Sequence, residues 1–354
     1  MPSPVLFADL TTLRLGGPAP ELITATTGDE IAEALRKADA GAGALVLGGG
    51  SNLVVADAGV DVPVVRVAVP GVQVRPSADG AEDSASVTVG AGVNWDDVVA
   101  ELTDAGFADL GPLSGIPGST GATPVQNVGA YGTELSDVLV AVTVYDRAEQ
   151  RIRTMPAAEL GLGYRTSVLR GTERAVVLDL TLRVHRGDTR IRYAELARTL
   201  GVPIDGLAPP DQVRQAVLAL RRGKGMVLDP SDPDTTSAGS FFTNPILGPA
   251  AAARTAAAIE ARLGEGTTYP AYPAADGGIK LSAAWLIERA GFAKGHPGPG
   301  GRVAISGKHT LALTNRGGGS TADLLTLARE IRDGVDAAFG VRLRPEPMLV
   351  GVSL

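Results

Sequence analysis

The chain has 354 residues, of which 44% are hydrophobic and 20% are charged, and its formal net charge is −7. This is the composition of an ordinary globular protein, the length predicts two or three domains, and the negative charge argues against a nucleic-acid surface. Because the sequence contains no cysteine, disulfides, thiolate metal sites and thiol catalysis are excluded. The three histidines, His185, His296 and His309, lie in no recognisable triad or metal motif, so we expect no metal site.

The sequence carries no signal for a membrane or for export. No stretch is long and apolar enough to span a bilayer. The N-terminal segment MPSPVLFADLTTLRLGG lacks the basic start and the long apolar run of a signal peptide. We therefore expect a cytoplasmic protein without membrane insertion, and no obligate protein partner is evident.

The first part of the chain alternates helix and strand signals. A helix is predicted over 29–41, with Asp29 as its N-cap and Gly41 as its end. From about residue 70 the pattern becomes rich in strands. The expected strands cover residues 44–52, which run into a glycine loop, and residues 62–69, 86–93, 137–146 and 175–184.

The second half of the chain favours helices. The clearest covers 320–340, because Ser320 is a good N-cap, apolar side chains recur at helical spacing and Gly340 provides an end. The other expected elements are helices over 211–222, about 249–263 and 280–291, and a strand-like segment over 348–354.

Two glycine-rich loops, 47–53 and 111–132, interrupt these elements. In the first, Leu53 occupies the place of the third glycine of a Rossmann fingerprint, so we reject that motif. The segment 301–310 fails the Walker pattern, because its glycines are one residue too far apart and His309 replaces the serine or threonine. Each loop could be a set of tight turns, or its backbone N–H groups could cradle a pyrophosphate.

The second loop is the stronger functional candidate, because long loops inside compact domains are commonly functional. Its Ser119, Gln126 and Asn127 carry side chains that could hydrogen-bond to a polar heterocycle.

The stretch SAGSFFTNP, residues 237–245, places one small hydroxyl in an unusual setting. Gly239 allows the backbone to turn or to approach another group closely. Phe241 and Phe242 would anchor the segment by burial and hold Ser240 beside an apolar wall. Taken alone, the stretch is more typical of an ordinary turn serine that precedes a buried aromatic pair.

Five stretches in fixed order give a family resemblance that covers the chain from about Leu10 onward. Together they closely resemble the UDP-N-acetylenolpyruvoylglucosamine reductase family. Each motif is weak by itself, and their order makes the resemblance specific. The stretches are GGGSNLVV, GIPGSTGATPVQNVGAYG, YRTS, GSFFTNP and LRPEPMLVG.

The resemblance implies an α+β fold, in which an FAD-binding fold of the vanillyl-alcohol-oxidase type with two α+β subdomains precedes a C-terminal α+β substrate domain. The expected boundaries are 1–66 for the first FAD subdomain, joined by the C-terminal segment 341–354, then 67–205 for the second subdomain and 206–340 for the substrate-binding domain. The last segments of the chain would thus return to pack beside its first.

The resemblance also implies the reaction and its cofactors. With NADPH as electron source and FAD as carrier, an enolpyruvyl ether on a UDP-sugar would be reduced to a lactyl ether, a step in peptidoglycan precursor synthesis. We expect the FAD to be noncovalent, because Ser51 stands in the pyrophosphate loop where relatives with covalent flavin often have histidine or cysteine. The residues expected to hold FAD are Gly48, Gly49, Gly50, Ser51, Asn52, Leu53, Gly118, Ser119, Gly121, Gln126 and Asn127.

Three residues match the catalytic positions of the family. Arg165 of YRTS would stabilise the negative charge that spreads into the substrate carboxylate, because a guanidinium grips a carboxylate bidentately and stays charged. Glu346 of RPEP would be its partner carboxylate, and Ser240 would donate the proton to the substrate carbon.

Further residues match substrate-binding positions. Tyr193 matches a substrate-capping tyrosine, which would place the chain in the larger subclass of the family. The run 223–230 and Thr243 depart from the commoner family pattern and leave local substrate contacts in doubt. The other expected contacts are Arg221, Lys224, Asn244 and Lys280.

Two other functions share part of this evidence. A sugar or alcohol oxidase of the same flavin fold would need the two FAD loops, but nothing in it calls for Arg165, Ser240 and Glu346 together. A sugar-nucleotide-binding protein without turnover would not need intact candidates for all three roles. The reductase is therefore the favoured function.

Overall fold

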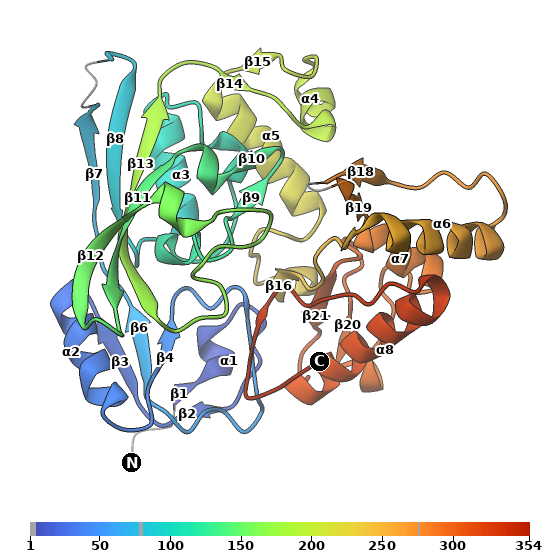
Figure 1. Ribbon diagram of the computed structural model, residues 1–354, viewed down its shortest axis with the longest axis horizontal. Helices are drawn as coiled ribbons and strands as arrows, with labels where there is room; N and C mark the ends of the chain where they lie inside the picture. The colour runs from blue at the N-terminus through green and yellow to red at the C-terminus, as the bar shows by residue number, and fades with distance from the viewer. Residues whose placement is uncertain (1–4, 78–80, 275–276) are drawn as a thin grey trace. The chain divides into compact units, whose positions relative to one another are not determined.

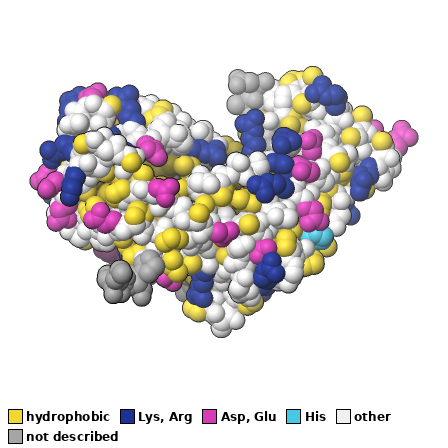
Figure 2. Space-filling model, turned by 90° about the horizontal axis from the view of Figure 1, so that it is seen from below, with side chains coloured by type: hydrophobic (Ala, Val, Ile, Leu, Met, Phe, Trp, Pro, Cys, Tyr) yellow, Lys and Arg dark blue, Asp and Glu magenta, His cyan; other side chains and the backbone are white. Residues whose placement is uncertain are grey.

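The computed structural model describes residues 5–77, 81–274 and 277–354 (Figure 1). The first four residues, which belong to the stretch examined for a signal peptide, lie outside the described residues. The chain folds into two compact units, and basic and acidic side chains both occur on the face that Figure 2 presents. The first unit holds Val5, Ala19–Gly50 and Asp61–Val227, and the second holds Leu6–Pro18, Ser51–Val60 and Leu228–Leu354.

A small parallel sheet opens the first unit. Its strand order is β3 (Leu22–Ala25), β6 (Val64–Val67), β4 (Leu45–Leu47), and helix α2 (Gly28–Asp39) packs against β3 and β6 (Figure 1). The expected helix and both expected strands are confirmed.

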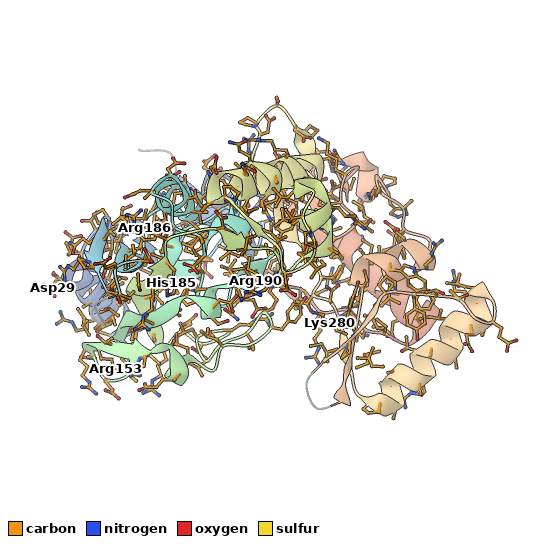
Figure 3. All side chains as sticks on the ribbon, turned by 90° about the horizontal axis from the view of Figure 1, so that it is seen from above. Asp29, Arg153, His185, Arg186, Arg190 and Lys280 are labelled. Carbon is orange, nitrogen blue, oxygen red and sulfur yellow. The ribbon has the colours of Figure 1, made fainter. Side chains whose placement is uncertain are left out.

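The ends of α2 differ from the prediction. The N-cap is Thr27, whose hydroxyl accepts a hydrogen bond from the Glu30 amide at 3.2 Å, and the C-cap is Ala40. Asp29, labelled in Figure 3, lies one position inside the first turn, where its charge favours the helix dipole without capping the helix. Threonine and aspartate are both good caps, and the sequence pattern alone does not separate them.

A five-stranded antiparallel sheet forms the main core of the first unit. Alternate side chains of its strands are buried together with Trp95, Val98 and Leu102 of helix α3 (Trp95–Asp104). The strands expected over 86–93, 137–146 and 175–184 are confirmed to within three residues at their ends. The strand order is β12 (Arg151–Pro156), β11 (Leu139–Asp146), β13 (Ala175–His185), β8 (Ser84–Gly90), β7 (Val72–Pro76).

A smaller core closes the first unit. Helix α5 (Pro210–Gly223), predicted over 211–222, buries Val213 and Val217 against Leu196 of helix α4 (Ala194–Leu200). The short pair β14 (Thr189–Arg190) and β15 (Leu207–Ala208) brackets α4 along the chain.

The second unit combines small sheets with two long helices and a shorter one. Strand order is β16 (Ser237–Ser240), β21 (Ala312–Asn315), β20 (Val303–Ile305) in one sheet and β17 (Ile246–Leu247), β19 (Ile279–Leu281), β18 (Ala271–Pro273) in another. A parallel pair joins β5 (Leu53–Val55) to β22 (Met348–Val350). The helices are α6 (Pro249–Leu263), α7 (Ala283–Ala290) and α8 (Thr321–Phe339).

Helix α8 matches its prediction at both ends, and α7 does not. Ser320 caps α8 and Gly340 ends it with φ +66°, as expected. The helix expected over 280–291 begins only at Ala283, because Lys280 and Leu281 form part of β19. Ser282 then caps α7 by accepting from the Trp285 amide at 3.3 Å.

Short elements complete the description. No helix among the described residues has the length and apolar character needed to cross a bilayer. The three-domain boundaries expected above stay a prediction. The short elements are β1 (Val5–Leu6), α1 (Phe7–Leu10), β2 (Pro18–Ala19), β9 (Gly129–Ala130), β10 (Thr133–Glu134), and the 3₁₀ turns η1 (Gly111–Leu113), η2 (Thr120–Ala122), η3 (Leu135–Asp137), η4 (Ala157–Leu160), η5 (Pro233–Thr235) and η7 (Pro299–Gly301).

Candidate active site

The two glycine loops meet inside the first unit. The amide of Gly49, just after β4, donates to Ser119 Oγ at 3.1 Å. A Cβ on Gly48 would lie 2.7 Å from Ser119 Oγ, and one on Gly49 would lie 2.6 Å from Gly118 Cα. The backbones therefore touch at a distance that only glycine permits. Residues expected to hold FAD from both loops are thus brought together.

The second loop is itself tightly folded. Gly118 has φ +118°, and buried Ser119 forms a β-bridge with Asn94, the N-cap of α3. A Cβ on Gly121 would lie 2.5 Å from that of Ala91. These contacts restrict the backbone of the second loop to one conformation.

Asn127 and Gln126 are buried within this loop. The Asn127 amide nitrogen donates to Glu134 Oε2 at 2.8 Å, and its oxygen accepts from the Ser136 amide at 3.0 Å. Asn127 therefore fixes the loop internally with both ends of its side-chain amide. Its expected contact with a heterocycle, and that of Gln126, stay predictions.

The remaining residues of the first loop belong to the second unit. Thr12 Oγ1 donates to the Ser51 carbonyl at 3.5 Å. The Asn52 side-chain amide donates to the Glu346 carbonyl at 3.5 Å, and the Asn52 carbonyl accepts from the Met348 amide at 3.0 Å. Asn52, expected at the cofactor, and Glu346, expected at the substrate, are thereby neighbours.

Ser240 lies at the end of β16, next to the segment that carries Glu346. Gly239 has φ +74°, and the pairing of β16 with β21 shifts register between Ser237 and Ser240. Phe241 donates its amide to the Leu311 carbonyl at 2.7 Å and accepts from the Glu346 amide at 2.9 Å. These backbone bonds hold the Ser240 and Glu346 segments side by side.

The aromatic anchor expected after Ser240 is present. Phe241 and Phe242 are each 1% exposed, and their rings meet edge to face with centroids 5.1 Å apart. The pair fixes the backbone on which the half-buried Ser240 sits.

His309, to which the sequence analysis assigned no role, lies beside Ser240. Its Nε2 lies 3.5 Å from Ser240 Oγ. The two residues are far apart in the chain, and His309 stands in no histidine motif. The segment 301–310, which contains His309, was considered only as a Walker motif and was rejected.

Arg165 occupies a strained turn in the first unit. Its φ is +51°, between the bridged residues Gly163 and Thr166. Its Nη2 donates to the Gly129 carbonyl at 2.7 Å, and its guanidinium lies 5.4 Å from the centroid of the Tyr164 ring. A carbonyl of the second glycine loop thus orients the guanidinium.

Tyr193 belongs to a cluster of aromatic and charged side chains in the first unit. Tyr193 is 44% exposed, and its ring meets the Tyr131 ring edge to face, with centroids 5.5 Å apart. Lys224 Nζ lies 2.6 Å from Glu195 Oε2 and 5.7 Å from the centroid of Tyr131. Burial raises the pKa of Tyr131 to about 12, so its phenol stays protonated. Sequence reasoning did not single out Tyr131 or Glu195.

Arg221 lies under this cluster and is 9% exposed. Burial lowers the pKa of its guanidinium, which still remains charged at neutral pH. Its Nη2 donates to the Met226 carbonyl at 3.0 Å, whereas Nε finds no hydrogen-bond partner among the described residues. A buried donor in this state is unusual in a folded protein.

Asn244 and Lys280 lie in the second unit. The Asn244 side-chain oxygen accepts from the Ala283 amide at 2.9 Å, at the start of α7. Lys280, labelled in Figure 3, lies in the central strand β19, opposite Ile246 and Tyr272. Asn244 therefore has a structural task, and the substrate contacts of both residues stay predictions.

Where Gly48, Gly49 and Gly118 meet, the absence of side chains lets the two backbones touch, and the Gly49 amide donates to Ser119 Oγ. Successive backbone amides of glycine-rich loops can bind phosphate oxygens. No group of three or more His, Cys, Asp or Glu within the described residues could hold a metal ion.

Comparison with known proteins gives two family matches. Residues 19–155 match the FAD binding domain family, and residues 230–350 match the C-terminal domain of UDP-N-acetylenolpyruvoylglucosamine reductase. Together they confirm the expected α+β fold as an FAD-binding domain followed by a reductase domain.

Individual relatives agree over nearly the whole chain. The chain is 56% identical to the UDP-N-acetylenolpyruvoylglucosamine reductase of Saccharopolyspora erythraea, over 98% of this chain and 95% of the relative. It is 53% identical to that of Thermobifida fusca, over 99% and 98%. A crystal structure of UDP-N-acetylenolpyruvylglucosamine reductase from Thermus caldophilus is similar with a TM-score of 0.65 at 26% identity, covering 98% of each chain. The chain therefore belongs to the UDP-N-acetylenolpyruvoylglucosamine reductase family of FAD- and NADPH-dependent oxidoreductases.

Proposed function

We propose that Arg165, Ser240 and Glu346 carry the chemistry by which this chain reduces UDP-N-acetylenolpyruvoylglucosamine to UDP-N-acetylmuramate. The reaction is an NADPH-dependent step of peptidoglycan precursor synthesis. The residue assignment rests mainly on one backbone hydrogen bond. The Glu346 amide donates to the Phe241 carbonyl, which holds Glu346 beside Ser240. The names of the relatives favour this reduction over a sugar oxidase and over a binding protein without turnover.

The paired loops would hold the flavin. When bound and reduced by NADPH, FAD supplies the hydride that is added to the enolpyruvyl double bond. The amides of Gly48, Gly50, Gly118 and Ser119 would bind the pyrophosphate, and the rest of the expected set would line the dinucleotide, with the Gly49 amide bonded to Ser119 Oγ. The contacts between the two loops support this role, because they fix the amides before any ligand arrives.

Each catalytic side chain has a distinct task. The Arg165 guanidinium would bind the substrate carboxylate, into which negative charge spreads as the double bond is reduced. Glu346 would hydrogen-bond to the enol-like carboxyl group. Ser240 would then give its proton to the substrate carbon, a step in which general acids typically contribute ~10²–10⁴-fold.

The exposed ring of Tyr193 would cap the substrate, with Tyr131 and Lys224 behind it. The buried Arg221 and the partly exposed Asn244 and Lys280 would complete the contacts to the UDP-sugar. The orphaned Nε of Arg221 supports this role, because an anionic ligand would satisfy it.

We also propose that the protein acts in the cytoplasm without an obligate protein partner. Its nucleotide-sugar substrate and NADPH are both charged metabolites that do not cross a bilayer unaided.

Separating the two half-reactions tests the proposal. NADPH under nitrogen should bleach the yellow protein, and the enolpyruvyl substrate should restore the colour. In Ser240→Ala, bleaching should keep its wild-type rate while recolouring slows by about 10²–10⁴-fold. Ser240→Cys should retain more activity than alanine, because a thiol still donates a proton. An alanine variant that recolours at wild-type speed would end the assignment of Ser240 as proton donor.

A further inference from the structure

The turn between β20 and β21 brings an imidazole to Ser240. His309 lies in this turn, residues 306–311, with its Nε2 3.5 Å from Ser240 Oγ. Ser240 pairs with Ala312 immediately after the turn, and the Phe241 amide donates to the Leu311 carbonyl at 2.7 Å. Backbone pairing therefore sets the approach of the two side chains.

Hydrogen bonds within the 306–311 turn, and one from a residue outside it, fix its backbone. Ser306 is fully buried, and its hydroxyl accepts from the amides of Lys308 at 3.0 Å and His309 at 3.2 Å. The Gly307 amide donates to Asp234 Oδ1 at 2.8 Å. These bonds leave the backbone under His309 little freedom to move.

The charged groups near the turn are largely paired with one another. Lys308 Nζ lies 2.6 Å from Asp232 Oδ2. This hydrogen bond raises the pKa of Lys308 and lowers the pKa of Asp232, so both stay charged around neutral pH. The imidazole is the side-chain type that ordinarily titrates near neutrality. The other charged groups on the elements packed here are Asp234, which pairs with Arg316 at 2.6 Å, Glu288, which accepts from Thr310, and Glu346.

We propose that His309 is a positioning residue that orients Ser240 and resupplies its proton. The inference rests on the role proposed above for Ser240. The imidazolium Nε2–H donates to Ser240 Oγ and points the serine proton toward the substrate carbon. As the new C–H bond forms, the serine O–H bond breaks. The imidazolium N–H then breaks to reform the serine O–H, and neutral His309 recovers a proton from water.

Serine needs such a partner for energetic reasons. A serine hydroxyl is a weak acid, and the alkoxide it leaves would be poorly stabilised at a half-buried position. A neighbouring imidazolium stabilises that oxygen and neutralises it within the same site. A distance of 3.5 Å is long for this bond, but such contacts commonly tighten once substrate is bound.

The test compares His309→Gln, His309→Ala and the matched control His296→Gln in stopped-flow measurements on the holoenzyme. His296 lies in the same unit and pairs with Glu330 at 3.3 Å. The wild-type recolouring rate should fall as pH rises through the range in which histidine side chains ordinarily lose their proton. In His309→Gln, recolouring should be at least about 10-fold slower at pH 6 and independent of pH, a smaller loss than removal of the acid itself.

Bleaching by NADPH should be unchanged in all three variants, and added imidazole should restore recolouring in His309→Ala. A wild-type pH profile in His309→Gln, or a slowed His309→Ala that imidazole does not rescue, would overturn the proposal. If circular dichroism shows that His309→Ala does not fold, the pH profile of His309→Gln decides. If recolouring is slow in Ser240→Ala but normal in His309→Gln, only the role of His309 is refuted. If recolouring is fast in Ser240→Ala, the proposed role of Ser240 itself is refuted.

Discussion

At the scale of single residues, two polar side chains that the motifs assign to ligands also hold the fold together. Asn127 is buried with both ends of its amide satisfied inside the loop, and Asn244 holds the start of α7. Sequence motifs identified both residues, but they could not separate direct contact with a ligand from support of the loop beneath it. That distinction depends on distances that only folding sets.

His309 shows the opposite failure. Motif reasoning relies on residues that are close in sequence or that match a known pattern. The contact between His309 and Ser240 joins a turn to a strand end far away in the chain. Ser240 could be proposed from the sequence because GSFFTNP stands among the five family motifs, whereas its local setting alone favours a turn serine.

Gly49→Ala should weaken flavin binding. The new Cβ would lie 2.6 Å from the backbone of Gly118, so one of the two loops must move. We expect purified Gly49→Ala to contain much less FAD than the wild type. The measurement is the ratio of flavin absorbance, at about 450 nm, to protein absorbance, at about 280 nm. Gly248→Ala is the control, because its Cβ would meet nothing within 4 Å. Full flavin content in Gly49→Ala would show that this close approach does not matter for the cofactor.

At the scale of elements, local patterns located helices and strands well and their ends less well. Both ends of helix α8 were predicted correctly, because a capping box marks its start and a glycine marks its end. Helix α7 starts three residues later than expected, because residues 279–281 pair in a sheet with β17 and β18. Apolar spacing in a short segment does not separate such a strand from a first helical turn.

The cap of α8 also makes stability depend on pH. Arg302 donates to Asp323 at 2.7 and 2.9 Å, and these hydrogen bonds are the main cause that lowers the pKa of Asp323 from 3.8 to about 2. A carboxylate with a lowered pKa in the folded state stabilises the protein above the unfolded value, and this stabilisation is lost as pH falls toward 2.

The melting temperature of Asp323→Asn should therefore lie below that of the wild type at pH 6, and the gap should narrow as pH falls from 4 toward 2. Asp336→Asn, in the same helix, is the control, because its carboxylate lies 3.7 Å from Arg342 on an exposed surface. A gap between Asp323→Asn and the wild type that stays constant down to pH 2.5 would contradict this account.

At the scale of the whole molecule, the five motifs predicted the family and its cofactors, and the comparisons confirm both. Hydrophobic patterns did not predict how the chain is shared between two compact units. Residues 51–60 join the second unit because β5 pairs with β22, and that pairing links segments nearly 300 residues apart. Local periodicity carries no information about such distant partners.

The flavin should be released by denaturation. Covalent attachment commonly uses histidine or cysteine, the chain has no cysteine, and Ser51 occupies the loop position in question. His185, labelled in Figure 3, ends β13 and lies 3.5 Å from Asp109. Acid precipitation should leave all the yellow colour in the supernatant. Colour that stays with the pellet after washing would show a covalent link.

The parallel pairing of β5 with β22 has a consequence for biosynthesis. Ser51 and Asn52, which lead into β5, take their place only when a strand made nearly 300 residues later is available to pair with it. A chain still emerging from the ribosome can build the sheets of the first unit, but it lacks the strand that fixes this part of the proposed flavin loop. Contacts of such long sequence separation form slowly. Flavin capture should therefore follow release of the finished polypeptide, and truncated chains should remain colourless.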